Sequence, residues 1–262
     1  MRLSLRLPLI VMGIPIDEVV NPYLVVPGEQ VKFELKYQEN CERADLSAEG
    51  LSQEVVGKAR EFWRRLMSGL NMNDCSYVRS EGLPQRRPVA STYAALTTAL
   101  LYLTARSHSD TVDELEIVEM GRMSDPWGEG ATWWQSSIDA MRYVAASGKA
   151  AAYRSEDEVV DLQLGRVDLN MEVRASSVVG KGATRQELGE SLFDAAVHMI
   201  GQAVVDLSDS LTSGSPLRGE LVKRLRVQNA AAYLFYGVQT PQGECEWVPG
   251  LPGELELMCL TA

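Results

Sequence analysis

Histidine and cysteine are scarce in this sequence of 262 residues. The two histidines are His108 and His198, and the four cysteines stand at positions 41, 75, 245 and 259. No CxxC pair occurs, and the short ligand spacings of a structural zinc site are missing. Two isolated histidines also suggest no Ser-His-Asp or Cys-His catalytic arrangement. The composition therefore argues against structural zinc and against hydrolases of those types.

Long hydrophobic runs are also missing. No apolar stretch approaches the roughly 18 residues that are needed to cross a bilayer. The first 16 residues have a basic start and a short apolar run, which raises the possibility of a signal peptide. Pro8, Gly13 and Pro15 interrupt that run and no small-residue cleavage site follows, so a first strand is the better interpretation. We expect a soluble, reducing, cytoplasmic setting by default.

Positive charge is in short supply. The chain has 25 Lys and Arg against 36 Asp and Glu, a formal net charge of −11. Binders of nucleic acid or anionic membranes need a basic surface that displaces counterions, so neither partner is expected. A homodimer or a protein partner stays open.

Strands and helices alternate along the first half of the chain. Short apolar runs separated by turn signals at Pro15, Asn21-Pro22 and Pro27-Gly28 predict three strands between Arg2 and Gln38. Apolar residues at helical spacing predict an amphipathic helix over 52–70. Further helices are expected over 109–121 and 132–148, and a hairpin over 149–164. This mixture predicts an α+β fold.

Two long helices dominate the second half. The first begins with a capping box, Thr184 and Glu187, and the second with Ser215-Pro216. Two short strands, 244–248 and 254–260, end the chain. No flexible linker separates the halves, so any two lobes share a tight interface. A boundary between residues 155 and 166 is expected.

Residues 82–103, GLPQRRPVASTYAALTTALLYL, form a loop that leads directly into a helix. The first turn of a helix presents unpaired backbone N–H groups and a positive dipole end, which together bind anions. Ser91 and Thr92 add hydroxyls, and Arg86 and Arg87 could clamp an anion. The alternative is that Ser91 only caps the helix while the arginines face solvent. Val89 favours that alternative, because glycine would allow a closer backbone approach.

The order of elements around PVASTYAALTTALLYL, IVEMGRMSDPWGEGATWWQSSIDAM and SPLRGELVKRLRVQNAAAYLFYGVQTP resembles the GHMP superfamily. The superfamily is named for the galacto-, homoserine, mevalonate and phosphomevalonate kinases. The resemblance implies a two-lobed GHMP-kinase-like fold. Residues 1–160 would form a nucleotide-binding lobe with a mixed sheet and helices, and residues 161–262 a ferredoxin-like α/β sandwich.

The same resemblance implies roles for individual residues. Ala90, Ser91 and Thr92 would occupy the end of a phosphate loop for ATP, with Arg86 and Arg87 supplying positive charge and the Ser91 hydroxyl holding Mg²⁺. Asp139 would lie near the acceptor alcohol as its base or orienting group. Gly250 and Gly253 in VPGLPGELEL would be what is left of a glycine-rich turn. The alternative for Asp139 is an exposed position on an amphipathic helix.

Departures from the family pattern leave two functions open. The family's Pro-Gly-Lys turn is absent, since Pro8-Leu9-Ile10 stands there, and two prolines accompany the glycines of the last motif. One reading is an ATP-dependent kinase, or a related decarboxylase, that phosphorylates the alcohol of a small metabolite such as a mevalonate-like acid. The other is a catalytically inactive GHMP-fold binding or scaffold protein. The tryptophan-rich stretch 125–134 would either wall a pocket or pack the lobes together.

Overall fold

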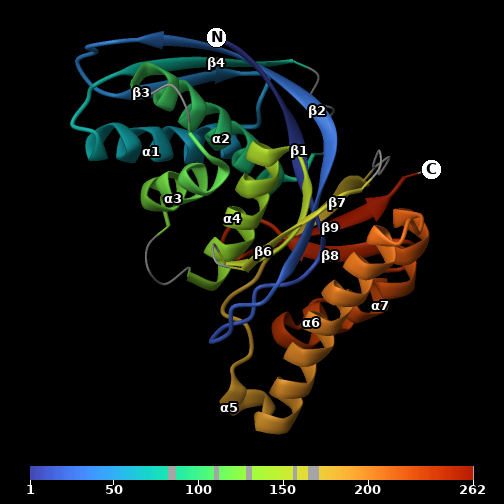
Figure 1. The fold of residues 1–262 in the computed structure, drawn as a ribbon. Helices are drawn as coiled ribbons and strands as arrows, with labels where there is room; N and C mark the ends of the chain where they lie inside the picture. The colour runs from blue at the N-terminus through green and yellow to red at the C-terminus, as the bar shows by residue number, and fades with distance from the viewer. Residues whose placement is uncertain (82–86, 109–111, 128–131, 156–157, 165–170, 262) are drawn as a thin grey trace.

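Two β-sheets and the helices around them make up the protein. The structure is a computed structural model, and it describes all residues except 82–86, 109–111, 128–131, 156–157, 165–170 and 262. Figure 1 shows the larger sheet above a group of helices, with the smaller sheet and two long helices beside it. The larger sheet uses strands from residues 2–162, and the smaller one uses strands from residues 171–260.

The six-stranded sheet is mixed, as the sequence predicts. Its path is β3-β4-β2-β5-β6, and β1 pairs with β2. The β3–β4 pair is parallel and the other pairs are antiparallel. The strands are β1 (Arg2–Met12), β2 (Tyr23–Gln38), β3 (Asp45–Glu49), β4 (Cys75–Glu81), β5 (Ala150–Ser155) and β6 (Glu158–Leu162).

The N-terminal strands differ from the prediction. Two long strands replace the three expected ones, because Pro27-Gly28 lies inside β2 instead of ending it. Pro27 pairs with Pro8 of β1, beside a register irregularity between Arg6 and Pro8. Proline cannot donate to a ladder, and a bulge lets the strands continue past such residues. Pro27-Gly28 is therefore part of a continuous strand and does not form a turn.

Alternation along β2 divides the core between the two faces of the larger sheet. Tyr23 and Val25 belong to the core shared with the first four helices, whereas Leu24 and Val26 belong to the core shared with the last two long helices. Successive side chains of a strand point to opposite faces, so β2 contributes to both layers. The first four helices are α1 (Gln53–Gly69), α2 (Val89–His108), α3 (Glu114–Ser124) and α4 (Thr132–Ser147).

The C-terminal part is an α/β sandwich whose described strands number three. Its sheet has the order β7-β9-β8 and is antiparallel throughout. The elements are β7 (Met171–Val178), α5 (Arg185–Leu188), α6 (Glu190–Thr212), α7 (Leu217–Tyr236), β8 (Cys245–Pro249) and β9 (Glu254–Leu260). The predicted capping box at Thr184 is confirmed, but it starts the short α5, and Gly189 separates that helix from α6.

The predicted boundary at residue 160 stays a prediction. A division there would cut β6, whereas the described strands change from one sheet to the other between Leu162 and Met171. Trp134 of α4 packs on Tyr236 of α7 with ring centroids 5.8 Å apart. This contact favours the lobe-packing role for part of the tryptophan-rich stretch. Among the described helices, none is long and apolar enough to cross a membrane.

All four cysteines form disulfides. Cys41 pairs with Cys75, and Cys245 pairs with Cys259 across directly opposite positions of β8 and β9. Structural disulfides persist mainly in oxidising compartments. The cytoplasmic setting expected from the sequence therefore stays a prediction, and the cysteine pairing does not favour it.

The disulfide between Cys245 and Cys259 joins residues that are 14 positions apart. Replacing both cysteines by alanine should lower the free energy of unfolding by about 3 kcal/mol, because the disulfide restricts a loop of this size in the unfolded chain. Urea unfolding of the variant and the wild type, each with and without a reductant, measures the effect. The difference should largely vanish in reductant. An equal difference under both conditions would show that the side chains, not the bond, carry the effect.

Candidate functional site

The N-terminus of α2 is closed by a carboxylate from the C-terminal sheet. The helix begins at Val89, directly after Pro88. Oε1 of Glu256, on β9, accepts a hydrogen bond from the Val89 backbone N–H at 2.7 Å, and the Ala90 N–H also points to this carboxyl group. Backbone N–H groups at a helix start bind anions because they have no partner within the helix. Here Glu256 occupies the position that a phosphate would take.

The β8–β9 turn lies beside the same helix end. Gly253 has a φ of +89°, which favours glycine. A Cβ added at Gly250 would lie 3.2 Å from Cγ of Glu256 and 3.1 Å from the Glu254 carbonyl oxygen. The structure therefore brings Gly250, which the family resemblance selected, next to Glu256 and through it to Val89. The nucleotide-binding role of both glycines stays a prediction.

Glu256 and Glu246 are both buried with unpartnered oxygens. Glu256 is 1% exposed, and its Oε2 has no hydrogen-bond partner among the described residues. Glu246 of β8 is 0% exposed, and neither of its carboxyl oxygens has such a partner. Burial raises the pKa of Glu256 to about 8, although the Val89 N–H acts in the opposite direction. Burial also raises the pKa of Glu246 well above its ordinary value.

The predicted phosphate-loop hydroxyls are used within the protein. Ser91 donates to Sδ of Met141 on α4 at 3.8 Å, and Thr92 donates to the Pro88 carbonyl at 2.8 Å. Both residues are buried, at 2% and 5% exposure. Ala90 is fully buried in the helical core. No group of three or more metal-binding side chains occurs in the described part of the chain.

Of the two arginines predicted to bind an anion, Arg87 is described by the structure. Arg87 forms an ion pair with Glu29 of β2. Its side chain is 10% exposed, and burial lowers its pKa. Arg86 lies outside the described residues. As they stand, the described residues do not fit Mg²⁺-ATP, because Glu256 covers the backbone donors and the Ser91 hydroxyl faces a sulfur.

Asp139 is buried in an ion-pair network. It is 2% exposed, which excludes the solvent-facing alternative. Nε of Arg122, on α3, donates to its Oδ2 at 2.9 Å, and Nε2 of Gln135 donates to its Oδ1 at 2.7 Å. Burial raises the pKa of Asp139 to about 6 against the opposing effect of Arg122 and Arg142. The carboxylate is held by neighbours on α3 and α4.

Ser91 contacts α4 through Met141, which follows Asp139 by two positions. Side chains two positions apart leave a helix on nearly opposite sides. The predicted shared cleft between Ser91 and Asp139 stays a prediction.

A second carboxylate, Asp125, anchors the network. The guanidinium of Arg142 binds it with two hydrogen bonds of 2.9 and 3.1 Å, and the Tyr93 hydroxyl donates to it at 2.6 Å. Arg142 is 0% exposed. A Cβ at Gly121 would lie 2.4 Å from a guanidinium nitrogen of Arg142, so any larger residue there would displace this buried group. The network joins α2, α3 and α4. Arg142, Asp125 and Asp139 are buried in it, whereas the Arg122 side chain is 42% exposed.

Several of these residues escaped the sequence analysis. Glu256 stands in ELELMCL, where alternation with leucine is typical of a solvent-facing position. Arg142 stands on an amphipathic helix, where an arginine is normally exposed. The sequence showed only that Gly121 and Asp125 lie near the end of a helix. Their common partner, Arg142, is 17 or more residues further along the chain. Long-range pairing of this kind needs the fold.

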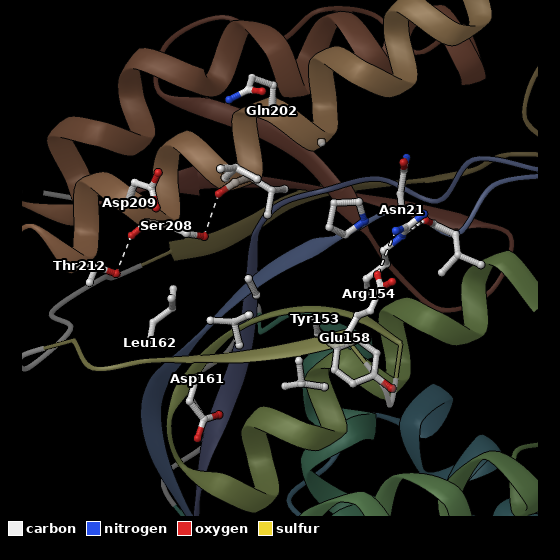
Figure 2. Close-up of a pocket in the computed structure, with 18 of the residues that line it drawn as sticks. Asn21, Tyr153, Arg154, Glu158, Asp161, Leu162, Gln202, Ser208, Asp209 and Thr212 are labelled. Carbon is white, nitrogen blue, oxygen red and sulfur yellow. Dashed lines mark hydrogen bonds and ion pairs between the residues drawn. The ribbon is translucent and has the colours of Figure 1, made fainter.

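A separate cavity of about 1090 Å³ lies between the β5–β6 hairpin and α6. Figure 2 shows Ser208, Asp209 and Thr212 on its helical side and Asp161 and Leu162 on its strand side. None of the site residues predicted from the sequence lines it. It is therefore distinct from the α2 N-terminus.

Glu256→Gln should change how stability depends on pH. The folded protein keeps the Glu256 proton up to about pH 8, whereas the ordinary pKa of 4.5 applies after unfolding. Between these values the unfolded state binds fewer protons, so the free energy of unfolding falls as pH rises, by up to about 1.4 kcal/mol per pH unit. Glutamine lacks this proton. The variant should therefore gain stability relative to the wild type from pH 5 to pH 8 in urea unfolding.

Glu42→Gln provides the matched control, because Glu42 is exposed. Its stability difference from the wild type should stay constant over the same pH range. Parallel pH curves for Glu256→Gln and the wild type would show that the folded state does not hold this proton.

Asp125→Ala should destabilise the protein by about 3–5 kcal/mol, because it leaves the Arg142 guanidinium buried without its main partner. Asp45→Ala is the control. Asp45 pairs with Arg64 at 2.9 Å but its side chain is 48% exposed, so its loss should cost at most about 1 kcal/mol. Urea unfolding at neutral pH compares the two. Similar small losses for both would mean that the buried pair is not a structural anchor.

Comparisons with known proteins find similarity in structure only. No family model matches the chain, and no curated protein matches it. Mevalonate kinase from L. major in complex with R-mevalonate superposes with a TM-score of 0.61 and 11% identity, covering 100% of this chain and 87% of that chain. Mevalonate kinase from Methanococcus jannaschii gives 0.60 and 10%, covering 100% and 90%.

A related decarboxylase has the same architecture. Mevalonate diphosphate decarboxylase from Staphylococcus aureus superposes with a TM-score of 0.58 and 10% identity, covering 99% of this chain and 87% of that chain. At such identities the likeness concerns the fold, and chemistry depends on individual sites. The chain has a GHMP-kinase-like fold over its whole length.

Proposed function

We propose that this chain is a non-catalytic protein with a GHMP-kinase-like fold, which serves as a binding or scaffold protein. The observation that carries the proposal is the Glu256 carboxyl group on the backbone N–H groups of Val89 and Ala90. A carboxylate and a phosphate compete for the same donors at a helix start. Glu256 belongs to the chain itself, so it needs no association step and is always available to fill this site.

Two further contacts support the proposal. Arg87 is paired with Glu29, and Asp139 is paired with Arg122, so neither side chain is directed at a phosphate or an alcohol. Moving Glu256 aside would also leave a buried carboxyl group without its backbone donors, which costs free energy. A nucleotide would have to repay that cost before it gained any net affinity.

A phosphotransferase is the second candidate. The fold shared with mevalonate kinases and the position of Gly250 beside the α2 N-terminus favour it. The pKa of Asp139, about 6, suits a general base near neutral pH. Under this candidate, ATP and Mg²⁺ would bind after Glu256 moves, and the acceptor would be a small alcohol such as a mevalonate-like acid. The cytoplasm would be its expected location.

Mg²⁺-ATP should not stabilise the wild-type protein. A ligand present at 100 times its dissociation constant adds about 2.7 kcal/mol to the free energy of unfolding. A thermal melt with and without millimolar Mg²⁺-ATP measures this directly. We expect no shift, and no ATP turnover with mevalonate or another small alcohol.

Glu256→Ala tests whether the carboxyl group is the cause. This variant frees the backbone donors of Val89, so it should gain stabilisation by inorganic phosphate that the wild type lacks. It should still not turn over ATP, because Arg122 continues to hold Asp139. Turnover of ATP by the wild type with any small alcohol would overturn the proposal in favour of the second candidate.

A further inference from the structure

The cavity between the β5–β6 hairpin and α6 is a groove with aliphatic walls. Its valines come from loop 19–22, from β6 and from α6. Three of them are exposed although they are apolar: Val20 at 39%, Val160 at 59% and Val205 at 50%. Contiguous exposed apolar surface on a protein commonly marks a binding site. None of the site residues described above lines this surface.

The edge of β6 runs along the groove. Five consecutive residues, 159–163, line the cavity, and consecutive residues of a strand point to opposite faces. The groove therefore follows the strand's edge and does not lie over one face alone. Among the described residues β6 pairs only with β5, so it ends the sheet. On the side away from β5, about half of its backbone N–H and C=O groups lack a strand partner.

An unpaired strand edge can accept a further strand, and any ligand that displaces its water must replace those hydrogen bonds. An apolar small molecule would fill the aliphatic space but would satisfy no backbone group, at a cost for each one that it desolvates. An extended peptide satisfies both requirements, because its backbone pairs with β6 and every second side chain enters the groove. The geometry favours a peptide strand over a lipid-like ligand.

Charge identifies the kind of peptide. The helix α6, which forms the opposite wall, has no Lys or Arg, and of its four acidic residues Asp209 lines the groove. Asp209 lies in the groove and forms no ion pair with any described residue. On the strand side Glu158 and Asp161 are also acidic, although Arg154 and Lys149 pair with them. The whole chain has a net charge of −11, so two copies that met here would repel each other.

We propose that the groove between β6 and α6 binds an extended, basic segment of a partner protein, which adds as a strand to the edge of β6. Its side chains that enter the groove would be of two kinds: apolar ones against Val160 and Val205, and a Lys or Arg facing Asp209. Figure 2 shows Asp209 and Leu162 on the two sides that such a strand would lie between. This inference names the partner class of the proposed binding function and rests on it.

A heptapeptide with Lys, Val, Val and Lys at its four odd positions and Ser between them, acetylated and amidated, is the probe, because its Val and Lys side chains then share one face. Seven residues extend to about 23 Å, longer than the five-residue β6. Fluorescence anisotropy of a labelled peptide at physiological salt gives its dissociation constant. We expect saturable binding, and weakening by at least about tenfold when every Lys is replaced by Glu.

Two N-methylated peptides separate strand pairing from simple hydrophobic contact. One carries N-methyl groups on its odd-numbered residues and the other on its even-numbered residues. Alternate residues of a strand direct their N–H groups to the same edge, so one of these peptides should lose binding and the other should keep it. Hydrogen exchange of the amides in residues 158–162 should slow when the unmodified peptide binds. Equal binding of both methylated peptides would overturn strand addition.

Val160→Lys and Val205→Lys test the two walls, and Val178→Lys is the matched control. Val178 lies on β7, outside the cavity, and is 86% exposed. The first two variants should each weaken peptide binding by at least about tenfold, and the control should leave it unchanged. All three replace exposed side chains, so their melting temperatures should stay close to that of the wild type.

The outcomes distinguish this inference from the proposed function. Peptide binding without ATP turnover supports both. Peptide binding together with ATP turnover would overturn the non-catalytic function and leave the groove intact. No binding of the basic peptide by the wild type, or equal binding by the Val160→Lys and Val178→Lys variants, would overturn the groove, whatever the ATP assay shows.

Discussion

The hydrogen bond between the Glu256 carboxyl group and the N-terminus of α2 is the contact on which the chemistry of this molecule depends. It joins the C-terminal sheet to a helix of the N-terminal part. A helix start presents backbone N–H donors without partners in the helix, and here the chain itself supplies the acceptor. Burial raises the pKa of this carboxyl group to about 8, against the effect of the hydrogen bond. One side chain therefore closes the anion site and links folding to pH.

The buried charges around Arg142 have a related consequence. Asp125 and Asp139 both lie against this guanidinium, and Arg122 holds Asp139 from the other side. Charges buried in this way are stable only as a complete set, because removing one partner leaves another unpaired. A carboxylate that served as a catalytic base would need freedom to take and release a proton beside its substrate. Under the proposed non-catalytic function, Asp139 instead connects α4 to α3 through Arg122.

Sequence periodicity was sufficient for most helices and strands, because each depends on local spacing. The helix Gln53–Gly69 follows from the apolar spacing of its buried face, and Gly148, with a φ of +69°, ends α4 as expected. The long β2 was missed because Pro27-Gly28 is a turn signal locally, whereas the pairing of Pro27 with Pro8 is a property of the assembled sheet. Pro8 and Pro27 are 19 residues apart, and sequence patterns within a single strand do not predict such a pairing.

The candidate site was less accessible to sequence reasoning for the same physical reason. The helix start near Val89 and the turn at Gly250 were both recognised, and the structure places them together. What lies between them, Glu256, looked like the exposed face of an alternating strand. The disulfide between Cys245 and Cys259 likewise requires the β8–β9 register, which spacing alone does not provide. The geometry of the candidate site depends on contacts between residues far apart in the sequence, and a local sequence pattern does not predict them.

The distribution of charge links the closed helix end to the open groove. A site for phosphate needs positive potential, yet this chain places carboxyl groups at the helix start and along α6. An acidic protein attracts basic partners and repels nucleotides at long range. The aliphatic groove beside β6 then supplies the short-range contacts that such a partner needs, with backbone groups able to specify an extended strand. In this fold the features suited to recognition therefore lie on the sheet edge, at a distance from the cleft where a kinase would bind its nucleotide.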